Sequence, residues 1–198
     1  MKALTARGER TRQKLLESAE RIFAELGYHD ASIVKITEAA GVGQGTFYLY
    51  FSSKQQVFDE VVLDLNSRVR HAMTEASERG KTRAERELLG FGAFFRFTAD
   101  HPALYRIIRQ AEFVSPATLV THYERLTEGY VAGLRQAMEA GEIVQGDPEV
   151  LAWSLMGIGE LVGMRWILWN GAQGMPEAVF DELARIIVRA IGAKDIDP

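Results

Sequence analysis

The apolar residues of this chain recur at spacings of three and four almost from end to end, and this periodicity constrains the fold more than any other feature. Residues spaced in this way fall on one face of an α-helix, and no segment shows the sustained alternation that a half-buried strand requires. Only five prolines interrupt the 198 residues. The pattern predicts an all-α protein of about nine helices. Their expected ranges are 7–26, 33–40, 46–51, 54–79, 83–99, 102–111, 116–140, 148–170 and 176–191.

Glycines and one long helix divide the predicted elements into two parts. Gly27 and Gly41 follow the first two helices, where a glycine commonly ends a helix. Three helices therefore form an N-terminal domain over residues 1–53. The helix over 54–79 would extend roughly 40 Å, which is long enough to cross the molecule. It begins a second domain over residues 54–198.

The most informative segment is residues 32–54, where two short predicted helices flank the corner Gly41-Val42-Gly43. Two helices joined by a glycine-bearing turn form a helix-turn-helix. Phe47 and Phe51 are four residues apart and fall on a buried face with Ile36 and Ala40. The residues that remain near the exposed face are Gln44, Gly45, Thr46, Tyr48, Leu49 and Tyr50.

Such a motif places its second helix in the major groove of DNA, where amides, hydroxyls and methyl groups meet base edges. Ser32 and Lys54 flank the segment and suit phosphate contacts. The alternative for the tyrosines is that they only pack in the core, but Tyr48 and Tyr50 lie off the buried stripe. The glycines at 41, 43 and 45 do not form a nucleotide loop, because no strand precedes them and no Lys-Ser/Thr follows directly.

The pattern G-x-x-x-G-T-F-Y-x-Y-F-x-S-K, followed by a long helix, resembles the signature of the TetR family of transcriptional regulators. The resemblance is clear over residues 10–60. It implies that Tyr48, Tyr50 and Lys54 contact the phosphate backbone. Bases would face Gln44, Gly45, Thr46 and Leu49. The chain departs from the family at Val34, where an arginine is common, so Lys35 would supply the positive charge, and at Thr37, where a small alanine is usual.

Composition adds exclusions and a location. The net charge is −4, and the only excess of positive charge lies in residues 1–54, with eight basic and six acidic side chains. The absence of cysteine suits a reducing interior. Neither a signal peptide nor an uncharged apolar run of membrane-spanning length is apparent. We therefore expect a cytoplasmic protein with no membrane partner.

An enzyme is not expected. The four histidines form no H-x-x-x-H pair, no carboxylate cluster has metal spacing, and no G-x-S-x-G elbow occurs. The sequence accordingly predicts no catalytic residue, no metal site and no cofactor.

The last two predicted helices carry more apolar surface than one protomer needs, which indicates a symmetric four-helix interface in a homodimer. Two reading heads about one DNA turn apart also require a two-fold axis. The residues assigned to this interface are Leu155, Ile158, Val162, Trp166, Val179, Leu183 and Ile186.

Aromatic rings are dense in the second domain, and cavities lined by such rings bind apolar ligands. For any single ring, packing in the core is the more frequent role. The residues assigned to a ligand site are Phe91, Phe95, Tyr105, Arg109, Tyr123, Tyr130 and Trp153.

Together these features predict a ligand-responsive regulator that binds a palindromic operator on double-stranded DNA as a homodimer. It would act as a repressor released by a small, largely apolar effector, such as a fatty acyl or acyl-CoA compound or an aromatic. Two alternatives stay open. One is an effector-independent DNA-binding or architectural protein, and the other is an activator.

Overall fold

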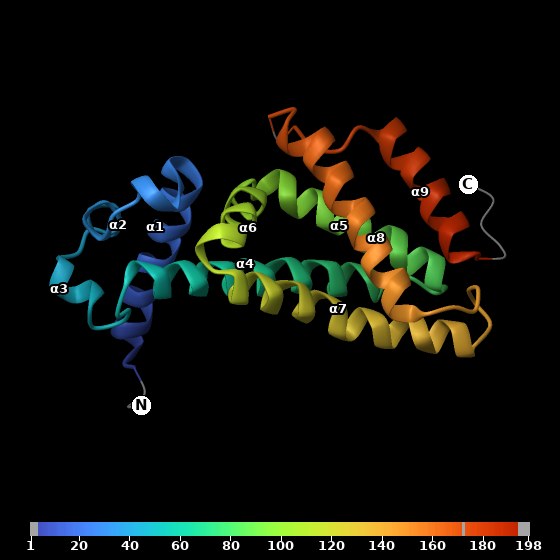
Figure 1. Cartoon of the computed structure of the whole chain (residues 1–198), viewed down its shortest axis with the longest axis horizontal. Helices are drawn as coiled ribbons and strands as arrows, with labels where there is room; N and C mark the ends of the chain where they lie inside the picture. Colours follow the sequence, from blue (N-terminus) through green and yellow to red (C-terminus); the bar gives the residue numbers. More distant parts are fainter. Residues whose placement is uncertain (1–3, 172, 194–198) are drawn as a thin grey trace. The chain divides into compact units, whose positions relative to one another are not determined.

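A computed structural model describes residues 4–171 and 173–193, and within these residues the secondary structure is helical, without strands. Figure 1 shows the order of the helices. Their bounds are α1 Ala6–Asp30, α2 Ile33–Ala40, α3 Gln44–Phe47, α4 Lys54–Ser77, α5 Arg83–Asp100, α6 Ala103–Val114, α7 Pro116–Glu139, α8 Pro148–Gly163, η1 Met164–Leu168 and α9 Glu177–Ile191. The predicted all-α fold is confirmed.

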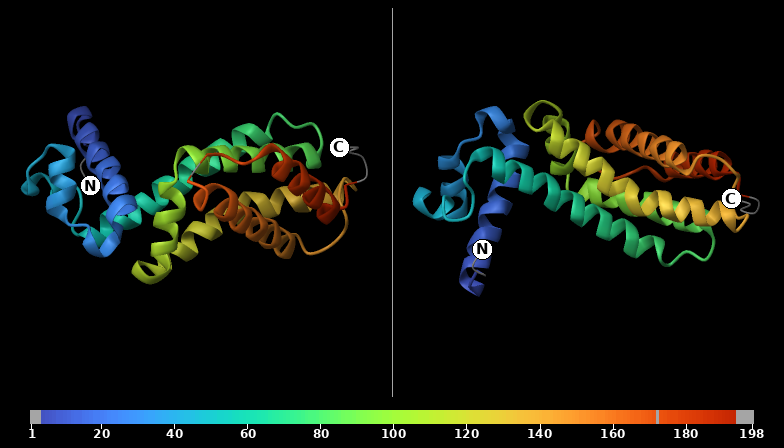
Figure 2. Two further views of the ribbon diagram at one scale, coloured as in Figure 1. Left: turned by 90° about the horizontal axis from the view of Figure 1, so that it is seen from above. Right: turned by 60° about the horizontal axis from the view of Figure 1, so that its bottom comes forward.

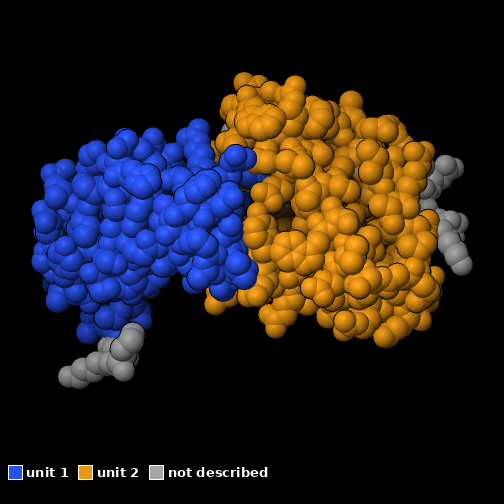
Figure 3. Space-filling model, viewed as in Figure 1, with its two compact units in different colours: residues 1–65, 103–122 blue, residues 66–102, 123–198 orange. Residues whose placement is uncertain are grey.

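The chain forms two compact units (Figure 3). Unit 1 comprises the residues up to Leu65 together with Ala103–His122, and unit 2 comprises Asn66–Pro102 and the residues from Tyr123 onward. The predicted boundary at residue 53 differs from this division. Unit 1 also takes in the first half of α4 and all of α6, because α1 needs both to cover its apolar face.

The core of unit 1 is built around α1. Thr5 caps the helix by accepting a hydrogen bond from the Gly8 N–H, and Phe23 is fully buried. The Phe23 ring meets the Phe58 ring of α4 edge to face, with ring centroids 5.2 Å apart. α6 contributes further buried residues to this unit, namely Leu104, Tyr105, Ile107, Ile108 and Ala111. The core of unit 1 therefore includes side chains from α4 and α6 as well as from the first three helices.

The predicted end of the first helix, at Gly27, is a kink within α1 in the structure. Gly27 has φ 78° within α1, and one further turn, up to Asp30, follows it. A positive φ of this kind favours glycine over any residue with a Cβ atom.

Unit 2 packs α5, α8, η1 and α9 around buried apolar side chains, and Figure 2 shows these helices from two further directions. Phe91 and Phe95 lie in this core, with ring centroids 6.1 Å apart. Gly159 of α8 lies against Phe91, and a Cβ atom at this glycine would come within 2.9 Å of the ring. The close approach of α8 to α5 thus requires glycine at position 159.

The predicted helix over 148–170 changes its winding near its end. α8 continues into η1, a π-helix in which the Trp169 N–H donates to the Met164 carbonyl at 3.0 Å. The segment Pro148–Leu168 has a mean hydropathy of 1.3 over its most apolar window and is long and apolar enough to cross a membrane by length and composition alone. The segment contains Glu149, Glu160 and Arg165, so it is not an uncharged apolar run. Helices of soluble proteins pass the same test when an apolar face packs in a core.

Candidate nucleic-acid interface

The helix-turn-helix corner forms as the sequence predicts. Ser32 caps α2, since its Oγ accepts from the Lys35 N–H at 3.2 Å. Gly41 ends α2 in the left-handed region with φ 65°. The Val42 N–H donates to the Thr37 carbonyl at 3.0 Å, which closes the turn before Gly43. α3 then begins at Gln44.

α3 is shorter than predicted and is extended by turns. It covers Gln44–Phe47, and the Tyr50 and Phe51 N–H groups both donate to the Phe47 carbonyl, at 2.9 and 3.0 Å. Phe47 and Phe51 are buried at 0% and 1% exposure. The two rings pack against each other on the buried side of this segment, with centroids 5.5 Å apart.

The opposite side of this segment is exposed. We call it the recognition ridge, and it consists of Gln44, Gly45, Thr46, Tyr48, Leu49 and Tyr50. Leu49 is 77% exposed and Tyr48 is 56% exposed. Gln44 and Gly45 are also exposed, whereas Thr46 and Tyr50 are half-buried. The structure therefore brings the predicted DNA-facing residues together on one surface of unit 1.

Tyr50 lies beside the start of α1. A Cβ atom built on Gly8 would be 3.5 Å from the Tyr50 hydroxyl oxygen. The Tyr50 phenol group therefore lies next to the α1 N-terminus, where backbone N–H groups attract anions.

Val34 and Lys35 both lie at the surface. Val34 is 42% exposed. The Lys35 ammonium donates to the Asp30 carbonyl at 3.0 Å, in an exposed position. This single bond leaves the charge accessible at the edge of the motif.

Lys54 has a role that the sequence did not reveal. Its ammonium donates to the Tyr28 carbonyl at 2.7 Å and to the Ala31 carbonyl at 2.8 Å. It also lies 4.3 Å from the centroid of the Tyr28 ring. Lys54 therefore ties the start of α4 to the segment between α1 and α2. No spacing rule would have indicated this contact, because the carbonyls lie more than twenty residues away.

Arg12 is a second residue that the sequence analysis missed. It forms an ion pair with Glu60 and lies over the Phe51 ring, 5.3 Å from its centroid. The pair links α1 to α4 beside the phenylalanine that supports the recognition ridge. The only available signal was a basic side chain on the polar face of α1.

The predicted ligand residues are divided between the two units. Tyr105 and Arg109 belong to α6 in unit 1, and the other five belong to unit 2. Phe91 and Phe95 are buried in the core of unit 2. Trp153 is 44% exposed, and its ring lies 5.8 Å from that of Tyr123. The Tyr123 hydroxyl donates to Glu160 Oε2 at 2.9 Å.

Tyr130 belongs to a buried polar cluster. Its hydroxyl donates to Glu87 Oε2 at 2.6 Å, and Glu87 forms an ion pair with Arg83. The Arg83 guanidinium also lies 5.4 Å from the Tyr130 ring centroid. Burial and the Glu87 charge raise the pKa of Tyr130 well above its ordinary value. Both carboxylate oxygens of Glu87 are thus engaged within the cluster, one by Arg83 and the other by Tyr130.

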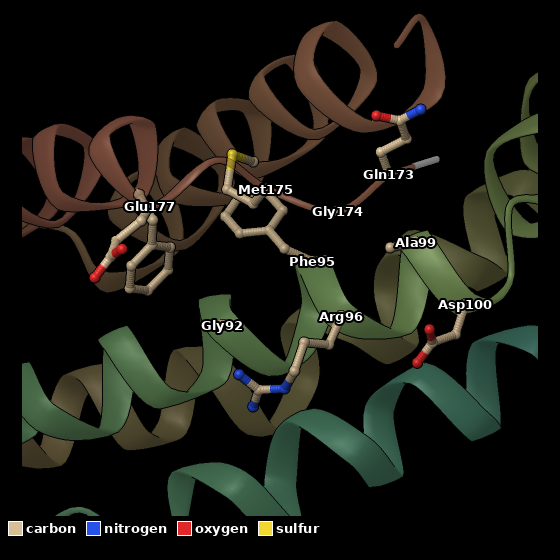
Figure 4. Close-up of a pocket in the computed structure, with 10 residues that line it drawn as sticks. Gly92, Phe95, Arg96, Ala99, Asp100, Gln173, Gly174, Met175 and Glu177 are labelled. Carbon is tan, nitrogen blue, oxygen red and sulfur yellow. The ribbon is translucent and has the colours of Figure 1, made fainter. Parts of the chain in front are cut away.

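A pocket of about 470 Å³ lies in unit 2, between α5 and the segment leading into α9 (Figure 4). Its lining residues are Gly92, Phe95, Arg96, Ala99, Asp100, Gln173, Gly174, Met175, Glu177 and Phe180. Of the predicted ligand residues, only Phe95 lines it. The pocket combines an apolar wall with one guanidinium and two carboxylates. Over residues 4–171 and 173–193, no group of three or more His, Asp or Glu side chains could hold a metal ion.

The predicted dimer residues fall into two sets. Leu155 and Leu183 are buried in the core of unit 2, at 0% and 3% exposure, so they are not available to a partner surface. Ile186 is 44% exposed. The remaining four are half-buried, namely Ile158, Val162, Trp166 and Val179. Apolar residues that were not assigned to the interface are more exposed on α8 and just after η1, namely Val150, Leu161 and Trp169.

Comparison with known proteins gives the same motif. Residues 15–61 match the family model of bacterial regulatory proteins of the tetR family. The chain is 36% identical over 109 residues to the uncharacterized HTH-type transcriptional regulator YdgC of Bacillus subtilis, covering 52% of this chain and 55% of that protein. It therefore spans about half the length of this relative.

Two further relatives cover more of the chain. The fatty acid metabolism regulator protein of Bacillus subtilis is 28% identical over 139 residues, covering 67% of this chain and 71% of that protein. The crystal structure of FadR from Bacillus subtilis in complex with stearoyl-CoA has a TM-score of 0.80 and 22% identity, covering 90% of this chain and 98% of that one. This structural likeness extends the shared fold to both units.

The matched residues run from Leu15 in α1 to Val61 in α4 and enclose the whole helix-turn-helix, including the recognition ridge. The relatives are transcriptional regulators, which agrees with the expectation that this chain is not an enzyme. The helix-turn-helix segment of this chain matches that of the tetR family of bacterial regulatory proteins, the resemblance that its sequence pattern indicated.

Proposed function

We propose that this protein is a cytoplasmic, homodimeric repressor that binds a palindromic operator and is released by a fatty acyl or acyl-CoA effector. The observation that carries the proposal is the recognition ridge, which exposes Tyr48 and Leu49 above a base of two buried phenylalanines. Because the two buried phenylalanines fix the backbone of the ridge, the ridge can enter a DNA groove without a change in backbone conformation. Little backbone conformational entropy is therefore lost on binding.

The roles of the ridge residues follow from their chemistry. Gln44 offers an amide to a base edge, and Leu49 and the Thr46 methyl group suit a thymine methyl. Gly45 allows close approach of the backbone. The phenols of Tyr48 and Tyr50 and the charge of Lys35 suit phosphate contacts. Ser32 would join them through its hydroxyl proton, whereas Lys54 would act mainly by positioning the motif.

A symmetric pair of subunits would supply the second reading head. The surface that we propose for it lies on α8, η1 and α9. Exposed apolar side chains there would be covered by the same surface of a second copy, in an isologous contact. The half-buried residues Ile158, Val162, Trp166 and Val179 would form its inner part with Ile186, and Leu155 and Leu183 would support it from the core.

The effector class rests on two observations. Aromatic and aliphatic side chains of α5, α7, α8 and α9 form the core of unit 2, and a pocket with Phe95, Met175 and Phe180 in its wall lies beside it. The Bacillus subtilis structure of the same fold was solved in complex with stearoyl-CoA. An effector can release DNA only through a difference in its affinity for the two states of the protein, typically about 1 to 3 kcal/mol.

The binding test uses a labelled DNA fragment from upstream of the gene that encodes this chain. We expect the purified protein to bind it, with weaker binding as salt rises. Leu49→Ala should weaken binding by roughly tenfold, because a base contact is lost while the fold is retained. The matched control is Val120→Ala, which removes an apolar side chain that is 55% exposed on α7. Equal affinity of Leu49→Ala and the control would contradict the assigned interface.

The effector test adds stearoyl-CoA to the preformed complex. Release of the DNA at micromolar concentrations supports the proposed class, provided that coenzyme A alone has no effect. If neither stearoyl-CoA nor a series of aromatic compounds releases DNA, the effector-independent alternative is favoured.

A further inference from the structure

The break in α1 leaves the Tyr28 N–H without its helical partner. In an unbroken helix, this N–H would donate to the Ala24 carbonyl. Gly27 has φ 78° and ψ 163°, which interrupts this ladder. Polar backbone groups that are removed from water need other hydrogen-bond partners.

A single side chain from α6 accepts from this N–H and also donates to a carbonyl of the preceding turn. Gln110 Oε1 accepts from the Tyr28 N–H at 2.6 Å, and Gln110 Nε2 donates to the Phe23 carbonyl at 3.3 Å. Nε2 also donates to the Arg106 carbonyl of its own helix at 2.8 Å, which fixes the amide. We call the arrangement of Gln110, the Phe23 carbonyl and the Tyr28 N–H the amide latch.

The segment that the latch holds leads directly into the DNA-binding motif. α2 begins at Ile33, only a few residues after Tyr28. α4 holds the same segment from another side, through the Lys54 ammonium and through a hydrogen bond of 3.2 Å from the Tyr28 hydroxyl to Gln55 Oε1. A shift of α6 would therefore pull on the entry to α2 and, through it, on the recognition ridge.

α6 is also the part of unit 1 that is connected on both sides to unit 2 in sequence. It follows α5, which ends at Asp100 in unit 2, and it leads into α7, whose residues from Tyr123 onward belong to unit 2. One polar contact stabilises the corner between α6 and α7, and a second joins this corner to α4. Ser115 Oγ donates to Thr118 Oγ1 at 2.9 Å, and Thr118 Oγ1 donates to Asp59 Oδ1 at 3.0 Å.

We propose that Gln110 is a positioning residue that couples the placement of α6 to the orientation of the helix-turn-helix. The inference rests on the proposed DNA-binding function. The side-chain amide of Gln110 makes the orientation of α2 and α3 dependent on the position of α6. Removal of the amide breaks the link between α6 and the entry to α2, leaves the contacts from α4 to this segment in place, and leaves the cores of both units in place.

The test compares Gln110→Met with Gln136→Met, which changes an exposed glutamine on α7. Binding of the labelled upstream fragment is measured well below the melting temperature of each variant. We expect Gln110→Met to bind roughly tenfold more weakly, within the range seen for residues that modulate coupling. We also expect faster hydrogen exchange confined to residues 28–40. A merely structural contact would lower the melting temperature and leave both the affinity of the folded protein and the local exchange unchanged.

Gln110→Glu provides a second variant in case the methionine variant folds poorly. Its carboxylate still accepts from the Tyr28 N–H but cannot donate to the Phe23 carbonyl, so we expect an intermediate loss of affinity. If the wild-type protein does not bind DNA, the proposed function fails and the inference fails with it. If the wild type binds DNA and both Gln110 variants bind equally well, the inference alone is wrong.

Discussion

The recognition ridge and the interior of unit 2 show two different relations between sequence and function. On the ridge, the residues that the sequence marked as functional are exposed together, with Leu49 at 77% exposure. In unit 2, Phe91, Phe95 and Tyr130 were marked in the same way, but they pack in a core or close a polar cluster. A motif of a few turns determines its own exposed face, whereas a cavity depends on how whole helices pack.

The sharpest test of this contrast uses neighbouring residues of the motif. Phe47→Ala should lower the free energy of unfolding by about 4 kcal/mol, because the ring is fully buried. Leu49→Ala should change it by less than about 0.5 kcal/mol, since the side chain is exposed. Urea denaturation of both variants measures the difference. Similar losses for both would mean that the ridge is part of the core.

The second test asks whether the polar cluster around Tyr130 stabilises the fold. Arg83→Met should cost about 3 kcal/mol, because it leaves the Glu87 carboxylate buried without its cation. The double variant Arg83→Met with Glu87→Met should recover much of this loss in the same denaturation experiment. If the single variant is as stable as the wild type, the cluster does not stabilise the fold, and the contrast between the two regions weakens.

The third test uses pH and a histidine of unit 1. Burial lowers the pKa of His122 from 6.5 to about 4. Below pH 6.5 the His122 imidazole is protonated in the unfolded chain but stays neutral in the folded protein until the pH nears 4. The contribution of this group to the free energy of unfolding is therefore fully present above pH 6.5 and is lost as the pH falls toward 4. Between pH 6.5 and 5 the loss from this group is about 2 kcal/mol. His122→Gln should flatten this part of a stability profile measured by chemical denaturation.

The smallest expected effect is at the cap of α2. Ser32→Ala removes the acceptor of the Lys35 N–H and should cost about 1 kcal/mol. Ser67→Ala, at an exposed position in the middle of α4, is the control and should be close to neutral. Because Ser32 is also a proposed phosphate contact, its variant should lose more DNA affinity than the stability change explains. Thermal melts and DNA titrations on the same samples separate the two roles.

Much of the fold could be predicted because the signals are local. Ser32, Gly41 and the phenylalanine pair at 47 and 51 specify a cap, a turn and a buried face within a few residues of each other. The predicted helices of unit 2 also match closely, since Pro116, Pro148 and Gly141 lie at helix ends.

The rest depends on contacts between residues far apart in sequence. The carbonyls that bind the Lys54 ammonium and the backbone groups that bind Gln110 carry no side-chain signature at all. Likewise, an apolar stripe on α8 does not tell whether Leu155 faces its own core or a second chain. Only the packing of unit 2 shows that it is buried within the protomer.

The division of α4 between the two units has a consequence for how such regulators can be rearranged. A fragment cut after residue 53 would lack Val57, Phe58 and Val61, as well as the whole of α6, and would expose Phe23. The reading head is therefore not a cassette that can be transplanted by joining chains at the end of the motif. A chimera that keeps this core from a single parent would have to exchange two separated stretches of sequence at once, residues 1–65 and 103–122.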